Sequence, residues 1–138
     1  MLGLTSLLSA LMFLVSGCNT VPLTERRRLL VVSEASENEM GVTAYQDVLK
    51  SEPVSKNEKY QELVKRVGQR IAAVADRPDF QWEFNVIESK TQNAFCLPGG
   101  KVAVYTGILP VCQDEAGLAV VMSHEVAHAI ARIGRAHV

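Results

Sequence analysis

Two histidines and a glutamate stand close together in the second half of the chain, as His124, Glu125 and His128. They lie inside the apolar stretch 116–133, whose pattern predicts a helix. Four residues along an α-helix rise about 6 Å, roughly one turn, so the two imidazoles project from the same face. At that spacing both can reach one metal ion. Glu125 leans to the side of the pair, where it can hydrogen-bond a metal-bound water.

This spacing is the H-E-x-x-H pattern of zinc peptidases. Neutral imidazoles leave zinc Lewis-acidic, so the pKa of a bound water falls to about 7. A nearby carboxylate then takes the proton as the water attacks a peptide carbonyl, and later passes it to the leaving amine. The alternative is a chance arrangement on an amphipathic helix. Because the chain has only 3 histidines, we expect His124 and His128 as zinc ligands and Glu125 as the catalytic base.

The start of this helix is marked in the sequence. Asp114 can accept a hydrogen bond as its N-cap, and Glu115 adds negative charge in the first turn, where the helix dipole favours it. Leu118, Val121 and Met122 are expected to bury one side. The helix therefore brings the metal site to the middle of the fold.

A β-hairpin is predicted upstream of the helix. Residues 93–97 and 101–105 flank the glycine-rich turn 98–100, and residues 81–86 alternate between polar and apolar as in a strand with one buried face. A sheet edge beside a metal helix can hold an extended peptide by main-chain pairing. A purely structural hairpin is the alternative.

Two further helices are expected before the strand. Capping boxes at Ser36–Glu39 and Ser55–Glu58 predict their starts, and Pro53 and Pro78 their ends. We expect both helices to support the metal helix from outside. The apolar stripe of the first is Met40, Ala44 and Val48, and that of the second is Tyr60, Leu63, Val64, Val67, Ile71 and Val74.

Residues 1–17 have the character of a signal peptide. They contain no charged side chain, and their apolar run 7–15 is too short to span a bilayer comfortably. The run leads into Val-Ser-Gly-Cys18, which resembles a bacterial lipobox, whose cysteine is lipidated and becomes the mature N-terminus. A plain signal peptide or a short buried helix are the alternatives.

The lipobox resemblance divides the chain into a signal peptide at 1–17, a lipid anchor and tether at 18–28 and a domain at 29–138. Asn19 follows the cysteine where lipoproteins kept in the inner membrane typically carry Asp. By that resemblance the protein is anchored in the bacterial outer membrane, facing the periplasm.

Composition limits the remaining possibilities. A chain of 138 residues and 15.1 kDa holds one domain besides a leader, and 48% hydrophobic residues suffice for a core. The net charge of −1 argues against a nucleic-acid partner. Cys96 and Cys112 can form a disulfide in an oxidising compartment or remain two buried thiols, and the sequence does not decide between them.

Residues 29–133 resemble the M48 peptidase family, which includes the HtpX heat-shock proteases, the CAAX prenyl endopeptidases and bacterial periplasmic lipoprotein peptidases. The resemblance rests on the run Asn-Ala-Phe-Cys-Leu-Pro-Gly-Gly at 93–100, Thr-Gly-Ile-Leu at 106–109 and Asp-Glu-Ala at 114–116, which leads into His-Glu-Val-Ala-His at 124–128. The order and spacing of these motifs are specific to the family.

The resemblance implies an α+β, zincin-like fold that is mostly helical, with a small sheet and hairpin beside the H-E-x-x-H helix. It implies a gluzincin in which His124 and His128 hold zinc and Glu125 is the general base. The expected activity is hydrolysis of peptide bonds in envelope proteins, as part of protein quality control. The hairpin residues expected to contact substrate are Phe95, Leu97, Gly99, Gly100 and Val102.

One feature departs from the family. Gluzincins take a third zinc ligand, a Glu, from a helix well downstream of the motif, whereas this sequence ends at Val138. We therefore expect the second half of the catalytic domain to be missing and the zinc site to be weak. His137 is an improbable substitute ligand. The alternative function is a catalytically inactive, truncated lipoprotein that binds partners, or a non-functional fragment.

Overall fold

The computed structural model describes residues 18–20, 27–29 and 32–132. The expected signal peptide and His137 lie outside these residues. The chain divides into two compact units, Met1–Ser33 and Glu34–Val138. In the first unit, β1 (Cys18–Thr20) pairs antiparallel with β2 (Arg27–Leu29), so a short pair of strands begins in the expected tether and ends at Leu29, the first residue of the expected domain.

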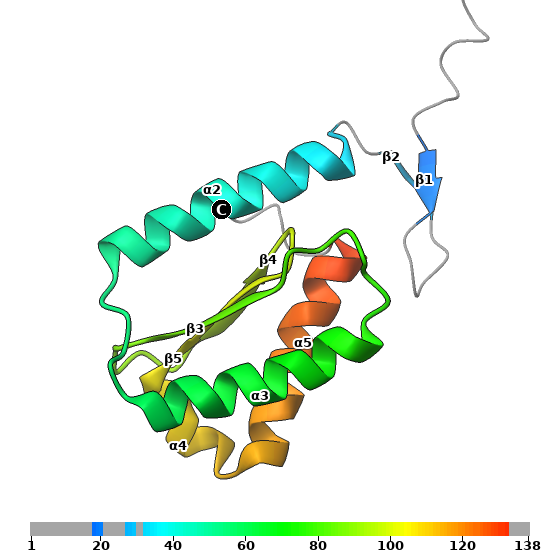
Figure 1. Ribbon diagram of the computed structural model, residues 1–138. Coiled ribbons are helices and arrows are strands. Elements are labelled where there is room, and N and C mark those ends of the chain that lie inside the picture. Colours follow the sequence, from blue (N-terminus) through cyan, green and yellow to red (C-terminus); the bar gives the residue numbers. More distant parts are fainter. Residues whose placement is uncertain (1–17, 21–26, 30–31, 133–138) are drawn as a thin grey trace, which may run out of the picture. The chain divides into compact units, whose positions relative to one another are not determined.

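A three-stranded sheet forms the centre of the second unit (Figure 1). Its order is β3 (Glu83–Ile87), β5 (Lys101–Tyr105) and β4 (Ala94–Leu97). The expected hairpin is confirmed: β4 pairs antiparallel with β5, with Leu97 opposite Lys101. On its other side, β5 pairs parallel with β3. Strand β5 is therefore central, and β3 and β4 are the edge strands.

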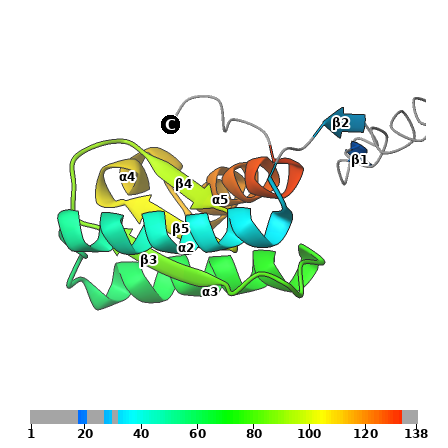
Figure 2. The ribbon, with the colours of Figure 1, turned by 90° about the horizontal axis from the view of Figure 1, so that it is seen from above.

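Helices cover both faces of this sheet. Helix α2 (Glu34–Ser51) lies on one face, which Figure 2 shows from above, and α3 (Glu58–Val74) and α5 (Glu115–Ala131) lie on the other. The short helices η2 (Thr106–Ile108) and α4 (Leu109–Cys112) connect β5 to α5. The expected mixed α+β architecture is confirmed. Of the two early helices expected to support the metal helix, α3 packs beside α5, whereas α2 packs on the opposite face of the sheet and meets α5 through the ion pair between Glu37 and Arg132.

Two apolar clusters fill the spaces between the layers. The larger one, between the sheet and helices α3 and α5, contains Val64, Val67, Val86, Val102, Val104, Leu118, Met122 and Val126. The smaller one, under α2, is formed by Tyr45, Ile87 and Ala103. Alternate residues of each strand enter opposite clusters, because successive side chains of a strand point to opposite faces.

The buried face of α2 differs from the predicted stripe. The helix buries Gly41 and Tyr45, whereas Met40 is 65% exposed. A side chain at Gly41 would overlap the carbonyl of Pro98, so glycine here allows the helix to approach the hairpin turn. The Tyr45 hydroxyl then donates a 2.6 Å hydrogen bond to the Val102 carbonyl of the central strand. Contacts with the sheet therefore decide which face is buried.

Neither predicted capping box is formed. Helix α2 already begins at Glu34, so Ser36 lies inside its first turn. Helix α3 is capped by Asn57, whose side chain accepts a hydrogen bond from the Tyr60 N–H. Ser55 lies two residues before this cap, where its hydroxyl donates a 2.5 Å hydrogen bond to Glu88 and accepts one of 3.3 Å from the Asn57 N–H.

The two domain cysteines are free thiols. Cys112 lies at the end of α4, next to the start of α5, whereas Cys96 is near Glu125, ten residues further along that helix. The disulfide that the sequence left open is therefore not formed.

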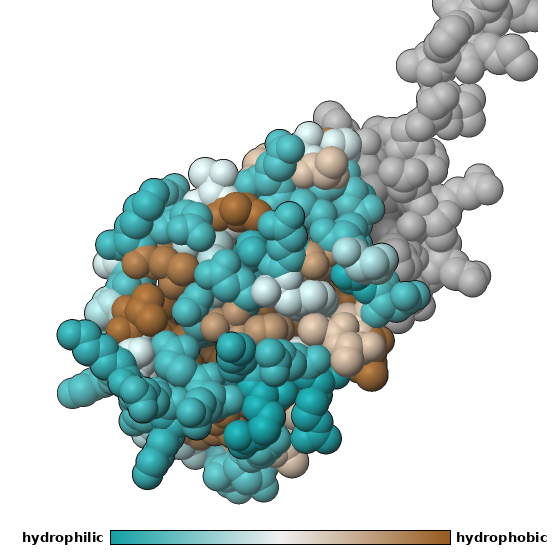
Figure 3. Space-filling view, viewed as in Figure 1, coloured by the Kyte–Doolittle hydropathy of each residue, from teal (hydrophilic) through white to brown (hydrophobic). Residues whose placement is uncertain are grey.

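Polar residues predominate on one face of the molecule. The face seen in Figure 3 is mostly hydrophilic, with apolar residues in separate patches. Within the described ranges, we find no helix with the length and hydrophobicity that a membrane span requires.

Candidate metal centre

Helix α5 positions the candidate site, and its predicted cap is confirmed. The Asp114 carboxylate accepts a 2.8 Å hydrogen bond from the Gly117 N–H, which satisfies one of the free amides of the first turn. Leu118, Met122 and Val126 recur every four residues and are buried against the sheet and α3. This buried stripe fixes the rotation of the helix about its axis.

The histidine pair lies beside that stripe, at the surface. The Nε2 atoms of His124 and His128 are 2.9 Å apart, and their ring planes are nearly perpendicular, at 87°. His124 is exposed and His128 is partly buried. The helical spacing thus brings two imidazole nitrogens together, as expected from the sequence.

These nitrogens fit a shared zinc ion. Two ligands of a tetrahedral zinc at about 2.05 Å lie roughly 3.4 Å from each other. A shift of about half an ångström in the side chains provides that separation, within the freedom of an exposed histidine. The donor set and its position at the surface both suit a metal that reacts with a large substrate.

Glu125 is partly buried and is close to strand β4. Burial, and then the negative charge of Glu125, raise the pKa of the Cys96 thiol on β4 to about 12. Helix α5, which carries Glu125, packs directly against this edge strand. The structure therefore brings the candidate base and the candidate peptide-binding edge together.

A third metal ligand is not found in the described part of the chain. No group of three His, Cys, Asp or Glu side chains is arranged to hold a metal among residues 18–20, 27–29 and 32–132. His124 and His128 are thus the two candidate ligands that the described residues offer.

Strand β4 offers backbone groups at its open edge. The Tyr105 N–H donates a 3.0 Å hydrogen bond to the Asn93 carbonyl, and in the antiparallel register every second residue of β4 pairs with β5 in this way. The residues between them, Ala94 and Cys96, therefore turn their N–H and C=O groups outward. An extended peptide can pair with these groups.

The five residues predicted to contact substrate lie on both faces of the hairpin and in its turn. Phe95 and Leu97 pack toward the smaller cluster under α2, on the sheet face opposite α5. Val102 is 0% exposed, and Gly99 and Gly100 are buried in the turn at positive φ. Val102 belongs to the larger cluster, on the α5 side of the sheet. Contact of these five residues with substrate remains a prediction.

Ala94 and Cys96 are not among the residues that the sequence predicts to contact substrate, although they lie on the same face of the sheet as α5. Both belong to the larger cluster, on the α5 side of the sheet. The alternation along the strand already indicates that residues 94 and 96 face the opposite side of the sheet from Phe95 and Leu97. Only the position of α5, however, identifies which face of the strand lies beside the histidines.

Comparison with known proteins agrees with this arrangement. The model of a family described as Peptidase family M48 matches residues 58–135, which include the histidine pair and the whole three-stranded sheet. The matched region begins with α3 and includes the whole of α5.

Individual relatives are metalloendopeptidases and proteases by name. The chain is 45% identical to Mitochondrial metalloendopeptidase OMA1 of Schizosaccharomyces pombe, over 81% of this chain and 34% of the relative. It is 31% identical to Metalloendopeptidase OMA1, mitochondrial, of Danio rerio, over 93% of this chain and 28% of the relative. It is 26% identical to Beta-barrel assembly-enhancing protease of Escherichia coli, over 73% of this chain and 21% of the relative. The chain thus spans about a third or less of the length of these relatives.

Proposed function

Because this chain belongs to peptidase family M48, we propose that it carries the zinc-binding helix and the peptide-binding edge of a zincin-like metalloendopeptidase. The observation that carries the proposal is the facing pair of Nε2 atoms, 2.9 Å apart on one helix, with Glu125 between them in sequence and near β4.

Each side chain has a separate role in this mechanism. His124 and His128 hold the metal, and zinc bound there supplies a Lewis acid. Glu125 accepts a proton from the attacking water and returns it to the amine that leaves. The outward N–H and C=O groups of Ala94 and Cys96 hold the substrate extended, which aligns its scissile bond with the helix.

The zinc affinity of the chain on its own is expected to be low. Structural and catalytic zinc sites generally use three or four protein ligands, whereas the described residues supply two. The gluzincin resemblance assigns the third position to a Glu further along such proteins. Experiments on this chain therefore need zinc in excess.

The test uses the purified chain, excess zinc and an unfolded protein substrate. We expect cleavage that a chelator abolishes and added zinc restores. Glu125→Gln should retain zinc and lose at least about a hundredfold in cleavage rate, within the range attributed to general base catalysis. Glu62→Gln, which changes an exposed carboxylate on α3, should leave cleavage unchanged. Cleavage that is insensitive to the chelator or to Glu125→Gln would show that the proposal is wrong.

We further propose that Cys18 is lipidated and anchors the protein in a bacterial envelope membrane, with envelope proteins as substrates. The lipobox-like sequence that ends at Cys18 supports this, and the E. coli relative is a beta-barrel assembly-enhancing protease by name. Other relatives are mitochondrial by name. Labelled fatty acid should be incorporated into the parent chain and not into Cys18→Ala, and release of the variant from the membrane fraction would confirm the anchor.

A further inference from the structure

The helix that carries the histidine pair ends in an unusual cap. Arg132 follows the last residue of α5 and has φ 55° and ψ 38°, the left-handed conformation. Its backbone N–H is directed at the carbonyls of His128 and Ala129. The carbonyl of His128 is one of the last four of the helix, which have no partner within it. The cap residue is therefore hydrogen-bonded to the backbone of a candidate metal ligand.

Arginine is not the residue that this conformation favours. Glycine, and less often asparagine, usually occupies the left-handed position after a helix, because a side chain there is strained. Backbone geometry alone therefore does not account for Arg132. Its side chain makes a contact that glycine could not make, the ion pair with Glu37.

The side chain of Arg132 forms a buried ion pair with α2. Its Nη2 atom lies 2.5 Å from Oε1 of Glu37, and the two side chains are only 7% and 14% exposed. Removal of one partner of such a pair leaves a charge buried without compensation. The pair thus joins the end of α5 to a helix on the opposite face of the sheet.

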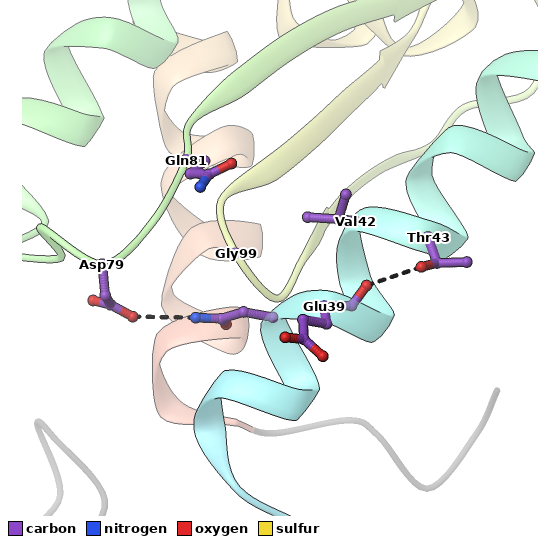
Figure 4. Close-up of a pocket in the computed structure, with 7 residues that line it drawn as sticks. Glu39, Val42, Thr43, Asp79, Gln81 and Gly99 are labelled. Atoms are coloured by element: carbon purple, nitrogen blue, oxygen red, sulfur yellow. Dashed lines mark hydrogen bonds between the residues drawn. The ribbon is translucent and has the colours of Figure 1, made fainter.

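The part of α2 that carries Glu37 is itself held in place. Glu34 forms an ion pair with Arg77, and Asn38 donates a 3.3 Å hydrogen bond to Asp79 (Figure 4). Gly99 of the hairpin turn packs against the same turn of the helix. These contacts fix the position of Glu37, and its ion pair with Arg132 in turn holds the last turn of α5.

We propose that Arg132 is a positioning residue for the metal centre. Held by Glu37, it keeps the last turn of α5 closed, so that His128 presents its Nε2 atom to that of His124. Helix ends otherwise fray, and His128 lies within the final turn of α5. This inference rests on the proposed function only in assigning the two histidines to a metal; the closure of the turn is a property of the metal-free chain.

The test uses two variants that break the ion pair from either side. Arg132→Gly accepts the left-handed backbone without strain and removes only the side chain, and Glu37→Gln keeps the shape of its partner. In the zinc-free chain, we expect amide hydrogen exchange in residues 129–132 to accelerate at least tenfold in both variants. Zinc affinity, measured by competition with a chromogenic chelator, should fall about tenfold or more, as for loss of other groups that orient metal ligands.

A matched control separates positioning from general stability. Glu115 forms ion pairs with Arg66 and Arg70 at the other end of the same helix. Glu115→Gln should leave zinc affinity and exchange in residues 129–132 unchanged, whatever its effect on the melting temperature. The double variant Glu37→Gln with Arg132→Gly should be no worse than the more affected single variant, since both act on one pair.

Two results would overturn the inference: unchanged exchange in residues 129–132 in both single variants, or effects on zinc affinity that simply add in the double variant. Failure of the proposed function has a different signature. If His124→Ala leaves zinc binding unchanged, the histidines are not the metal site, and the zinc-free exchange measurement still decides whether Arg132 holds the end of the helix.

Discussion

The Nε2 atom of His124 lies 2.9 Å from the Nε2 atom of His128. At this distance two imidazole lone pairs cannot face each other without repulsion, so either a proton or a cation must lie between them. In the metal-free chain one ring donates a hydrogen bond to the other. After a shift of about half an ångström, the same pair can share a cation that prefers nitrogen ligands, as we propose.

Loss of either ring should therefore remove the site. We expect His124→Ala and His128→Ala each to weaken zinc binding by more than about a hundredfold, beyond the effect of losing a group that only orients a ligand. Chelator competition measures the change. Ser123→Ala alters an exposed neighbour of His124 on α5 and should bind zinc as the parent does. A histidine variant with parental affinity would contradict the assignment.

The hydroxyl of Tyr45 should stabilise the attachment of α2 to the sheet. It donates a 2.6 Å hydrogen bond to the Val102 carbonyl and accepts one of 3.1 Å from Asn85, in a fully buried position. We expect Tyr45→Phe to lower the free energy of unfolding by about 1 to 2 kcal/mol, because a buried donor is lost and its partners remain. Tyr60→Phe, at a residue that is 38% exposed, should cost less in urea unfolding; an equal cost would contradict this role.

The stability of the protein should depend on pH through Asp79. A hydrogen bond from the Arg77 guanidinium, aided by its charge, lowers the pKa of this carboxyl to about 2. In the unfolded chain the pKa is about 3.9, so the unfolded state binds more protons between these values. The stabilisation is therefore complete above about pH 5 and is lost as the pH falls through 2.

Unfolding in urea at several pH values tests this dependence. The free energy of unfolding of the parent should fall between pH 5 and pH 2, and Asp79→Asn should show a smaller fall over the same interval. Arg77→Gln should flatten the curve in the same way, because it replaces the charged guanidinium donor with a neutral amide. Curves that remain parallel to that of the parent would exclude Asp79 as the source.

The cap of α5 can be tested separately from its metal site. Asp114→Ala removes the acceptor for the Gly117 N–H and should lower the free energy of unfolding by about 1 kcal/mol. Asp114→Ser supplies another capping oxygen and should retain most of the parental stability. Both should bind zinc as the parent does, since the cap lies at the opposite end of the helix from His128. Denaturant titration with parallel zinc binding gives the comparison.

The sequence alone determined the features that depend on near neighbours. The four-residue spacing of the histidines, the Asp114 cap and the Gly99–Gly100 turn each depend on residues within one helical turn or one hairpin. Local backbone geometry fixes which of these groups lie side by side, and the structure contains all three. For the same reason the motif pointed to the family before any contact was known.

Only the tertiary structure decided features that depend on residues far apart in the chain. Contacts with the sheet, rather than helical spacing, decide that α2 buries Tyr45 instead of Met40. Ser55 donates a hydrogen bond to the distant Glu88, and Asn57 rather than Ser55 caps α3. The ion pair that holds the end of the metal helix joins residues 37 and 132. Each of these features depends on a partner that is distant in the sequence and that satisfies a buried polar group. The local sequence pattern does not identify such partners.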